Sequence, residues 1–105
     1  MINAKFFIDR EGSPIGFTVS GHAGYAKSGK DIVCASVSSA VMLTVNTATE
    51  NFRIELDCKV EGDTISCIFK ESSSDGAKLL QGLKAHFEAL SEDYPKFIKV
   101  NISEV

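Results

Sequence analysis

The chain has 105 residues, of which 44% are hydrophobic and 24% are charged, and both fractions are ordinary for a globular domain. A chain of this length supports one hydrophobic core, so we expect a single domain over residues 1–105. The formal net charge of −3 argues against direct binding to nucleic acid, which needs a basic surface, and it favours a basic partner.

Apolar runs and cysteines in the sequence bear on membrane association and on the redox compartment. No secretory signal opens the chain, and no apolar run approaches the roughly 20 residues that cross a bilayer. Three cysteines, an odd number, argue against a disulfide framework. We therefore expect a cytoplasmic protein with no membrane partner, in a compartment where thiols stay reduced.

The N-terminal part of the chain predicts two β-strands, over residues 2–8 and 15–20. The segment between them contains Gly12 and Pro14 and is typical of a turn. Proline lacks an amide, so Pro14 should lie where the second strand starts. This hairpin carries the chain to a glycine-rich segment that begins at Gly21.

A helix is predicted from Ile32 to about Asn51, because apolar residues recur there at spacings of three and four. Valines are mediocre helix formers, so this helix should depend on burial against a sheet. The residues that carry the pattern are Val33, Val37, Ala40, Val41, Thr44 and Ala48.

Residues 53–60 and 64–70 alternate in polarity and predict a hairpin with Gly62 and Asp63 as its two-residue turn. Counting outward from the turn places Cys58 opposite Cys67, at a pair whose side chains lie close together. A disulfide or a metal site is conceivable there. We favour two reduced thiols in the core, because the expected compartment is reducing and no Cys-x-x-Cys motif or neighbouring histidine supports zinc.

The rest of the chain predicts a helix over residues 77–94, capped by Ser74 or Asp75 and ended by Pro95, and then a strand over 97–102. His86 is a second candidate base, but we interpret it as a partly exposed helix histidine, because nothing near it in the sequence resembles a site. The order is ββαββαβ. It favours an α+β fold, with two helices on one face of a mixed, mainly antiparallel sheet of about five strands.

The segment between residues 21 and 38 holds residue types suited to thiol catalysis. A thiolate attacks carbonyl groups far better than a thiol does, and His22 is a candidate base for Cys34. If Asp31 caps the helix, Cys34 is its third residue, where unpaired backbone amides lie ready to hold an oxyanion. Ser38 follows one helical turn later on the same face.

Each of these residues also has a structural interpretation. A single cysteine on an apolar helix is usually a small buried hydrophobe, and a loop histidine is usually solvated. Asp31 is favoured as the helix cap over a group that orients His22. Ser38 either contacts the sulfur or the substrate, or permits close helix packing. Spacing alone leaves these alternatives open.

The runs Gly21-His22-Ala23 and 29–35, followed by Ser38, resemble the signature of the ribosomal-processing cysteine protease family Prp. The resemblance implies a cytosolic bacterial endopeptidase that forms a homodimer. It implies that the enzyme removes the short N-terminal extension of a large-subunit ribosomal protein, the twenty-seventh, after an aromatic pair, and therefore has an apolar pocket beside the nucleophile.

Family resemblance also implies the roles of individual residues: Cys34 is the nucleophile, His22 is the base, and Asp31 and Ser38 support them. No metal or other cofactor is called for. We expect a loop that contacts the substrate, with Tyr25 facing its aromatic residues. The residues assigned to this loop are Gly21, Ala23, Gly24, Tyr25 and Gly29.

The alternative is a non-catalytic binding or assembly module for a ribosomal protein, in which the cysteine is incidental. Such a module would share the fold and the loop, so the reactivity of Cys34 is what separates the two hypotheses.

Overall fold

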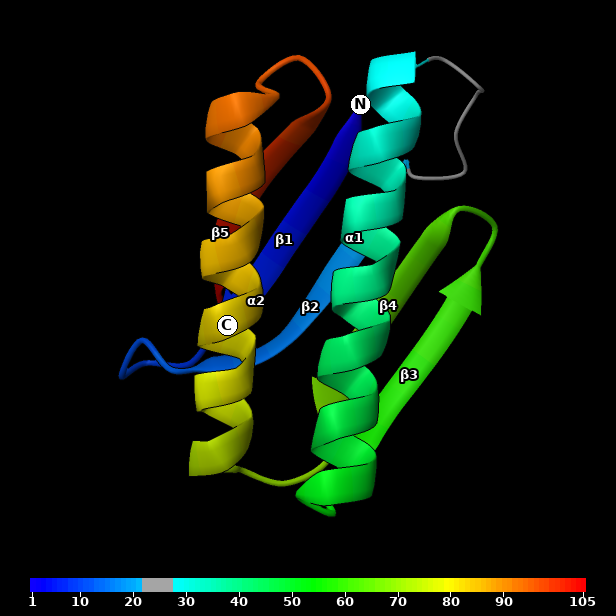
Figure 1. Ribbon diagram of the computed structural model, residues 1–105. Coiled ribbons are helices and arrows are strands. Elements are labelled where there is room, and N and C mark those ends of the chain that lie inside the picture. The colour runs from blue at the N-terminus through cyan, green and yellow to red at the C-terminus, as the bar shows by residue number, and fades with distance from the viewer. Residues whose placement is uncertain (22–27) are drawn as a thin grey trace.

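The computed structural model describes residues 1–21 and 28–105, with the backbone alone for residues 28–31. Two helices, α1 (Ser28–Asn46) and α2 (Ser74–Asp93), lie side by side on one face of a five-stranded sheet (Figure 1). The structure confirms the predicted α+β fold and the predicted order of elements.

The five strands are arranged in the order β3-β4-β2-β1-β5. β5 runs parallel to β1, and every other neighbouring pair is antiparallel, so the sheet is mixed and mainly antiparallel as expected. The strand bounds are β1 (Ile2–Ile8), β2 (Pro14–Ser20), β3 (Leu56–Glu61), β4 (Thr64–Phe69) and β5 (Ile98–Glu104).

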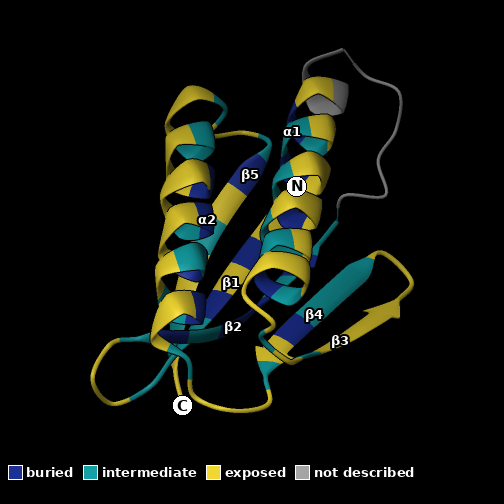
Figure 2. Cartoon of the chain, turned by 60° about the horizontal axis from the view of Figure 1, so that its bottom comes forward, coloured by how far each residue is buried: buried dark blue, intermediate teal, exposed yellow. Residues whose placement is uncertain are grey.

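The core lies between the helices and the central strands. Phe6 of β1 is fully buried, and its ring centroid lies 6.2 Å from that of Phe17 and 6.0 Å from that of Phe87. The valines predicted to face the sheet from α1 are buried, and so are Leu80 and Leu83 of α2. Figure 2 shows this division: the helices are buried on the side toward the sheet, whereas β3 is exposed. The buried helical residues in this core are Val33, Val37, Val41, Leu80, Leu83 and Phe87.

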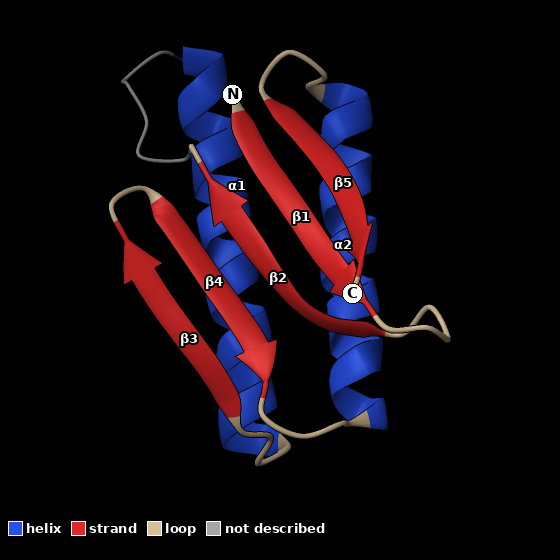
Figure 3. Ribbon diagram, turned by 180° about the vertical axis from the view of Figure 1, so that it is seen from behind, coloured by secondary structure: helices blue, strands red, loops and turns tan. Residues whose placement is uncertain are grey.

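The predicted hairpin register is confirmed. Glu61 pairs with Thr64, Val60 with Ile65, and Cys58 with Cys67. Gly62 begins the turn with φ of +59°, a conformation that glycine adopts without steric cost. β3 forms one edge of the sheet, and in the view from behind it lies at the side away from β5 (Figure 3).

The prediction that Cys58 and Cys67 are reduced core thiols is wrong. The structure joins them in a disulfide with a Cα–Cα distance of 4.1 Å. Directly opposed residues at a closely spaced antiparallel pair bring their side chains together, and the prediction gave more weight to compartment than to this geometry. Cys67 is buried but Cys58 is exposed, because neither described helix covers β3.

Several element boundaries differ from prediction; β3, for example, begins at Leu56 and not at residue 53. α1 begins at Ser28, one turn before Ile32, and passes into a short π-helical segment, η1 (Thr47–Asn51), so the helical path does reach Asn51. The cap of α2 is Ser73 and not Ser74 or Asp75, since the Ser73 hydroxyl accepts a 2.9 Å hydrogen bond from the amide of Gly76. β5 continues two residues beyond the predicted end at residue 102.

The helical path from Ile32 to Asn51 has a mean hydropathy of 1.5 and is long enough to cross a membrane. The expectation that no apolar run is long enough to cross a bilayer is therefore wrong, as judged by length and hydropathy. A core helix meets the same criterion, and α1 does bury three valines against the sheet. Length and hydropathy alone thus carry little weight for a membrane assignment.

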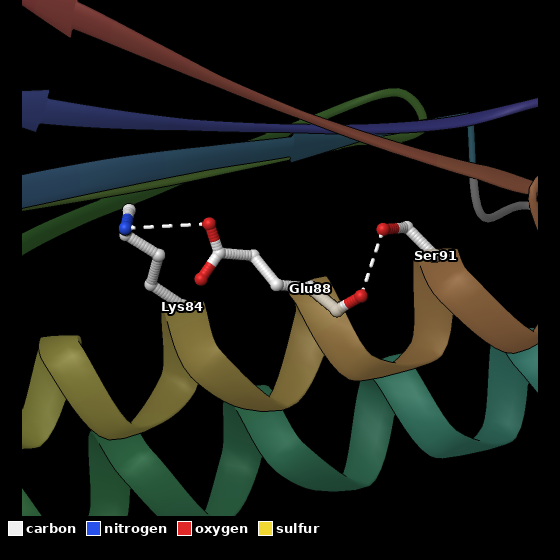
Figure 4. Close-up of polar contacts among 3 residues, drawn as sticks. All are labelled: Lys84, Glu88 and Ser91. Atoms are coloured by element: carbon white, nitrogen blue, oxygen red, sulfur yellow. Dashed lines mark hydrogen bonds and ion pairs between the residues drawn. The ribbon is translucent and has the colours of Figure 1, made fainter.

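The two helices differ in the charge that they carry outside the core. On α2, Lys84 forms an ion pair with Glu88 at 3.4 Å, and the Ser91 hydroxyl donates to the Glu88 carbonyl (Figure 4). The sequence of α1 has no charged residue after Asp31, and Met42 and Leu43 are exposed. A solvated helix normally presents a charged face, so α1 is unusual in this respect.

Gly21 ends the described part of the chain after β2 and has φ of +80°. A Cβ placed there would overlap the carbonyl oxygen of Met1. Gly12 has almost the same φ, +81°, but has no atom within 4 Å of that position. Alanine substitutions at the two glycines therefore separate the free-energy cost of backbone strain from that of a steric overlap.

We expect Gly21→Ala to lower the free energy of unfolding by about 2–4 kcal/mol, from strain at positive φ together with overpacking. Gly12→Ala should cost only the strain, about 1–2 kcal/mol. Urea denaturation of both variants measures the difference. Equal losses in the two variants would contradict the close approach of Gly21 to Met1.

Candidate active site

Cys34 is the cysteine whose sulfur remains free. All three cysteines lie in the described part of the chain, and Cys58 and Cys67 are bonded to each other. Cys34 is half-buried on α1 and packs against the core between the buried residues Val33 and Val37. This packing holds the Cys34 backbone in place while leaving the residue partly accessible to solvent, as a nucleophile requires.

The position of Cys34 within α1 differs from the prediction. Asp31 is the fourth residue of the helix and Cys34 the seventh, so Asp31 does not cap the helix. The amide of Cys34 lies beyond the first four residues, where helical amides are unpaired, and in a regular helix it bonds the carbonyl four residues earlier. The prediction that this amide helps to hold an oxyanion is therefore wrong.

Ser38 lies one turn after Cys34 and is exposed. It stands at an apolar groove of about 230 Å³ between α1 and the sheet. Val19 of β2 forms the floor of this groove together with Val37 and Val41, and Val60 of β3 forms part of its outer wall. The full lining is Val19, Val37, Ser38, Val41, Met42, Val60, Gly62 and Ile65.

The groove identifies residues that the sequence analysis did not assign to the site. Met42 lies one turn beyond Ser38, so Cys34, Ser38 and Met42 follow one another along the same face of α1. Val60 is 72% exposed although it is apolar. An apolar residue near the end of an edge strand is a usable signal of a binding surface, but the sequence does not reveal which strand is at the edge.

Several predicted site residues lie outside the described residues. They are His22, Ala23, Gly24 and Tyr25. Gly21, immediately before them, follows Val19 of the groove by two residues. Gly29 and Asp31 are part of α1, for which only the backbone is described at these positions. The 22–27 segment therefore connects Gly21 to the start of the helix that carries Cys34.

A second and larger groove, of about 640 Å³, lies between α1 and α2. Leu43, Leu79 and His86 contribute to its walls, and none of the three cysteines does. His86 lies on α2 and is exposed, so its place on a helix is as predicted and its exposure is greater than predicted. In the described residues, no cluster of three or more His, Cys, Asp or Glu side chains is arranged to hold a metal ion.

A sequence model of the family described as Cysteine protease Prp matches residues 1–99. The chain belongs to this family. A free cysteine beside an apolar groove is the arrangement expected of a cysteine protease, and membership of the family favours this activity over the non-catalytic binding module. The chain is a cysteine protease.

Two relatives share the family name. The ribosomal processing cysteine protease Prp of Bacillus subtilis is 29% identical, with 95% of this chain and 96% of the relative covered. The protein of the same name from Mycoplasma pneumoniae is 36% identical, with 77% of this chain and 80% of the relative covered.

A solved structure of the essential ribosomal processing protease Prp from Staphylococcus aureus, in complex with a substrate peptide, has a TM-score of 0.90 to this chain. The match covers 98% of this chain and all of that one, at 23% identity. At this level of identity the comparison shows a shared fold.

Alkylation of the unreduced protein should add one adduct, at Cys34, because the other two sulfurs are bonded to each other. Denaturation without reductant should leave that number unchanged, and reduction should raise it to three. Intact-mass spectrometry with peptide mapping measures this, and Cys34→Ala is the control. Three adducts on the denatured, unreduced chain would contradict the disulfide.

Proposed function

We propose that this chain removes the short N-terminal extension of the twenty-seventh large-subunit ribosomal protein, by cutting after an aromatic pair. The observation that carries the proposal is a free, half-buried Cys34 one turn from an apolar groove, in a chain of the Prp family. Relatives named as ribosomal processing proteases support the choice of substrate.

In the proposed mechanism Cys34 is the nucleophile and His22 the base. The Cys34 sulfur attacks the scissile carbonyl carbon as His22 takes the thiol proton, and the protonated imidazole then gives that proton to the leaving amine. Water, deprotonated by His22, attacks the resulting thioester and releases the acid and the free thiol. A Staphylococcus aureus structure with a covalently linked product peptide supports covalent chemistry in the family.

Asp31 and Ser38 are proposed as supporting residues. Because Asp31 lies in the helix three residues before Cys34, on the neighbouring turn, its role is to orient His22 and not to cap the helix. Ser38 is exposed and lines the groove, and we expect its hydroxyl to donate a hydrogen bond to a substrate carbonyl there. Tyr25 and the glycine-rich loop that begins at Gly21 are proposed to cover the bound peptide.

The groove suits an apolar side chain of the substrate. Its described lining consists of apolar side chains apart from Ser38 and Gly62, so an aromatic ring would be removed from water on binding. The net charge of −3 favours approach of a basic ribosomal protein. No cofactor enters the mechanism, and the proposed location is the cytoplasm, where ribosomes are assembled.

We also propose a homodimer, formed through the outer surface of the helices. The sequence of α1 carries no charge between Asp31 and Glu50. Leu43 is 69% exposed beside the groove between α1 and α2. An uncharged helix face next to an apolar groove is typical of a surface that is covered in an assembly.

The cleavage test uses a peptide that spans the aromatic junction of the ribosomal protein's extension. Wild type should cut after the aromatic pair, and mass spectrometry should find both products. Cys34→Ala and His22→Ala should each lower the rate by at least about a thousandfold, because nucleophile and base act as a unit.

Binding of the peptide by Cys34→Ala separates loss of chemistry from loss of recognition. Wild type that binds the peptide but leaves it intact would overturn the protease proposal and support a binding module. Retained cleavage by His22→Ala would overturn the role of His22 alone.

The dimer test places a charge on the uncovered face of α1. Leu43→Lys should convert a dimer, with about twice the chain mass of 11.3 kDa, into a monomer, because a buried unpaired charge opposes association. Light scattering after gel filtration measures the mass. Asn101→Lys adds the same charge at an exposed position of β5, on the face of the sheet away from the helices, and should leave the dimer intact. A monomeric wild type contradicts the proposal.

A further inference from the structure

The disulfide between Cys58 and Cys67 lies beside the groove of the candidate active site. Both cysteines point to the helix-facing side of the sheet, since directly opposed residues of a pair share a face. The next pair on that face toward the turn is Val60 with Ile65, and both of these residues line the groove. The cross-link is therefore two residues from the groove wall on each strand.

β3 has few other restraints in the described structure. It is an edge strand that pairs with β4 alone among the described strands. Only Leu56 of its six residues is even half-buried, and the other five are exposed. A strand held by one ladder and little burial opens locally at low free-energy cost, so the cross-link is a large part of what holds it.

The chemistry of the pair favours reversible exchange. The exposed partner is Cys58, and the buried partner is Cys67. A disulfide is broken when a thiolate attacks an accessible sulfur and the other sulfur leaves as thiolate. The asymmetry in exposure directs that attack to Cys58.

We propose that Cys58 and Cys67 form a dithiol–disulfide couple that controls how firmly β3 holds the outer wall of the substrate groove. The oxidised form fixes Val60 and Gly62 for peptide binding, and the reduced form lets this wall open. This inference rests on the proposed function, because it takes the groove as the place where the substrate binds.

The reductant is a small dithiol or a dithiol protein. Its first thiolate attacks Cys58, forms a mixed disulfide, and releases the Cys67 thiolate. Its second thiol then attacks its own bound sulfur and releases the Cys58 thiolate. Two electrons and two protons pass to the protein, and the dithiol becomes a disulfide.

Hydrogen exchange of the protein without peptide is the first test. Reduction with dithiothreitol should speed exchange of the β3 amides by about tenfold or more, because the cross-link constrains a short loop. Amides in β1 and β5 should not change and serve as the internal control. Unchanged exchange in β3 would overturn the proposal, whatever the peptide does.

Peptide affinity is the second test, and it uses Cys34→Ala so that redox reagents cannot act at the nucleophile. Reduction should raise the Kd of the substrate peptide by about threefold to tenfold, because a pre-organised wall binds at lower entropic cost. The Cys34→Ala, Cys58→Ser, Cys67→Ser variant should have the Kd of the reduced form and should not respond to dithiothreitol.

The outcomes separate the two proposals. Equal Kd values in the oxidised and reduced forms would overturn the redox control while leaving the protease intact. Failure of wild type to cut the peptide in either form is instead a failure of the proposed function, and the exchange measurement still decides whether the couple controls β3.

Discussion

The site depends on the burial of one valine stripe of α1 against the sheet. Val33, Val37 and Val41 are buried there, and each contributes about 1.5–3 kcal/mol by leaving water. Valine is a mediocre helix former, so α1 owes its stability in this part to the sheet. Because Cys34 follows Val33 directly, the burial of Val33 also fixes the direction in which the Cys34 side chain points from the helix.

Three consecutive residues of α1 show how one helix serves three surfaces. Val37 faces the core, Ser38 faces the groove beside β3, and Ser39 lies at the groove between the helices. Successive residues of an α-helix are about 100° apart, so this division is a matter of geometry. The core-facing side of α1 has no position for charge, and after Asp31 its exposed side carries none either.

The sequence predicted those features that local rules determine. The register of the β3–β4 hairpin followed from a two-residue turn, and the faces of both helices followed from apolar spacing. The order of strands did not follow, since the connections between helices and strands allow several arrangements. That order leaves β3 at the edge and exposes Val60 and Cys58. The groove and the position of the cross-link beside it therefore could not be predicted from local sequence patterns.

The candidate site was predicted in part. Cys34 and Ser38 lie on one face of a helix as expected. The error at Asp31 arose because aspartate is a good cap residue, whereas the helix begins three residues earlier, at Ser28, and no local signal in the sequence separates the two starts. The pairing of Cys58 with Cys67 was predicted but their oxidation was not, because redox state depends on chemistry outside the sequence.

The pairing of β5 with β1 has a consequence for the order in which the molecule is completed. Ile2 lies opposite Ile98, and the ladder continues to Ile8 opposite Glu104. Contacts between residues so far apart in the chain are slow to form, because a long loop must close first. During synthesis, β1 can pair with β2 early, but its other edge stays open until the last strand leaves the ribosome. A newly made chain thus carries an unprotected strand edge until β5 has been made.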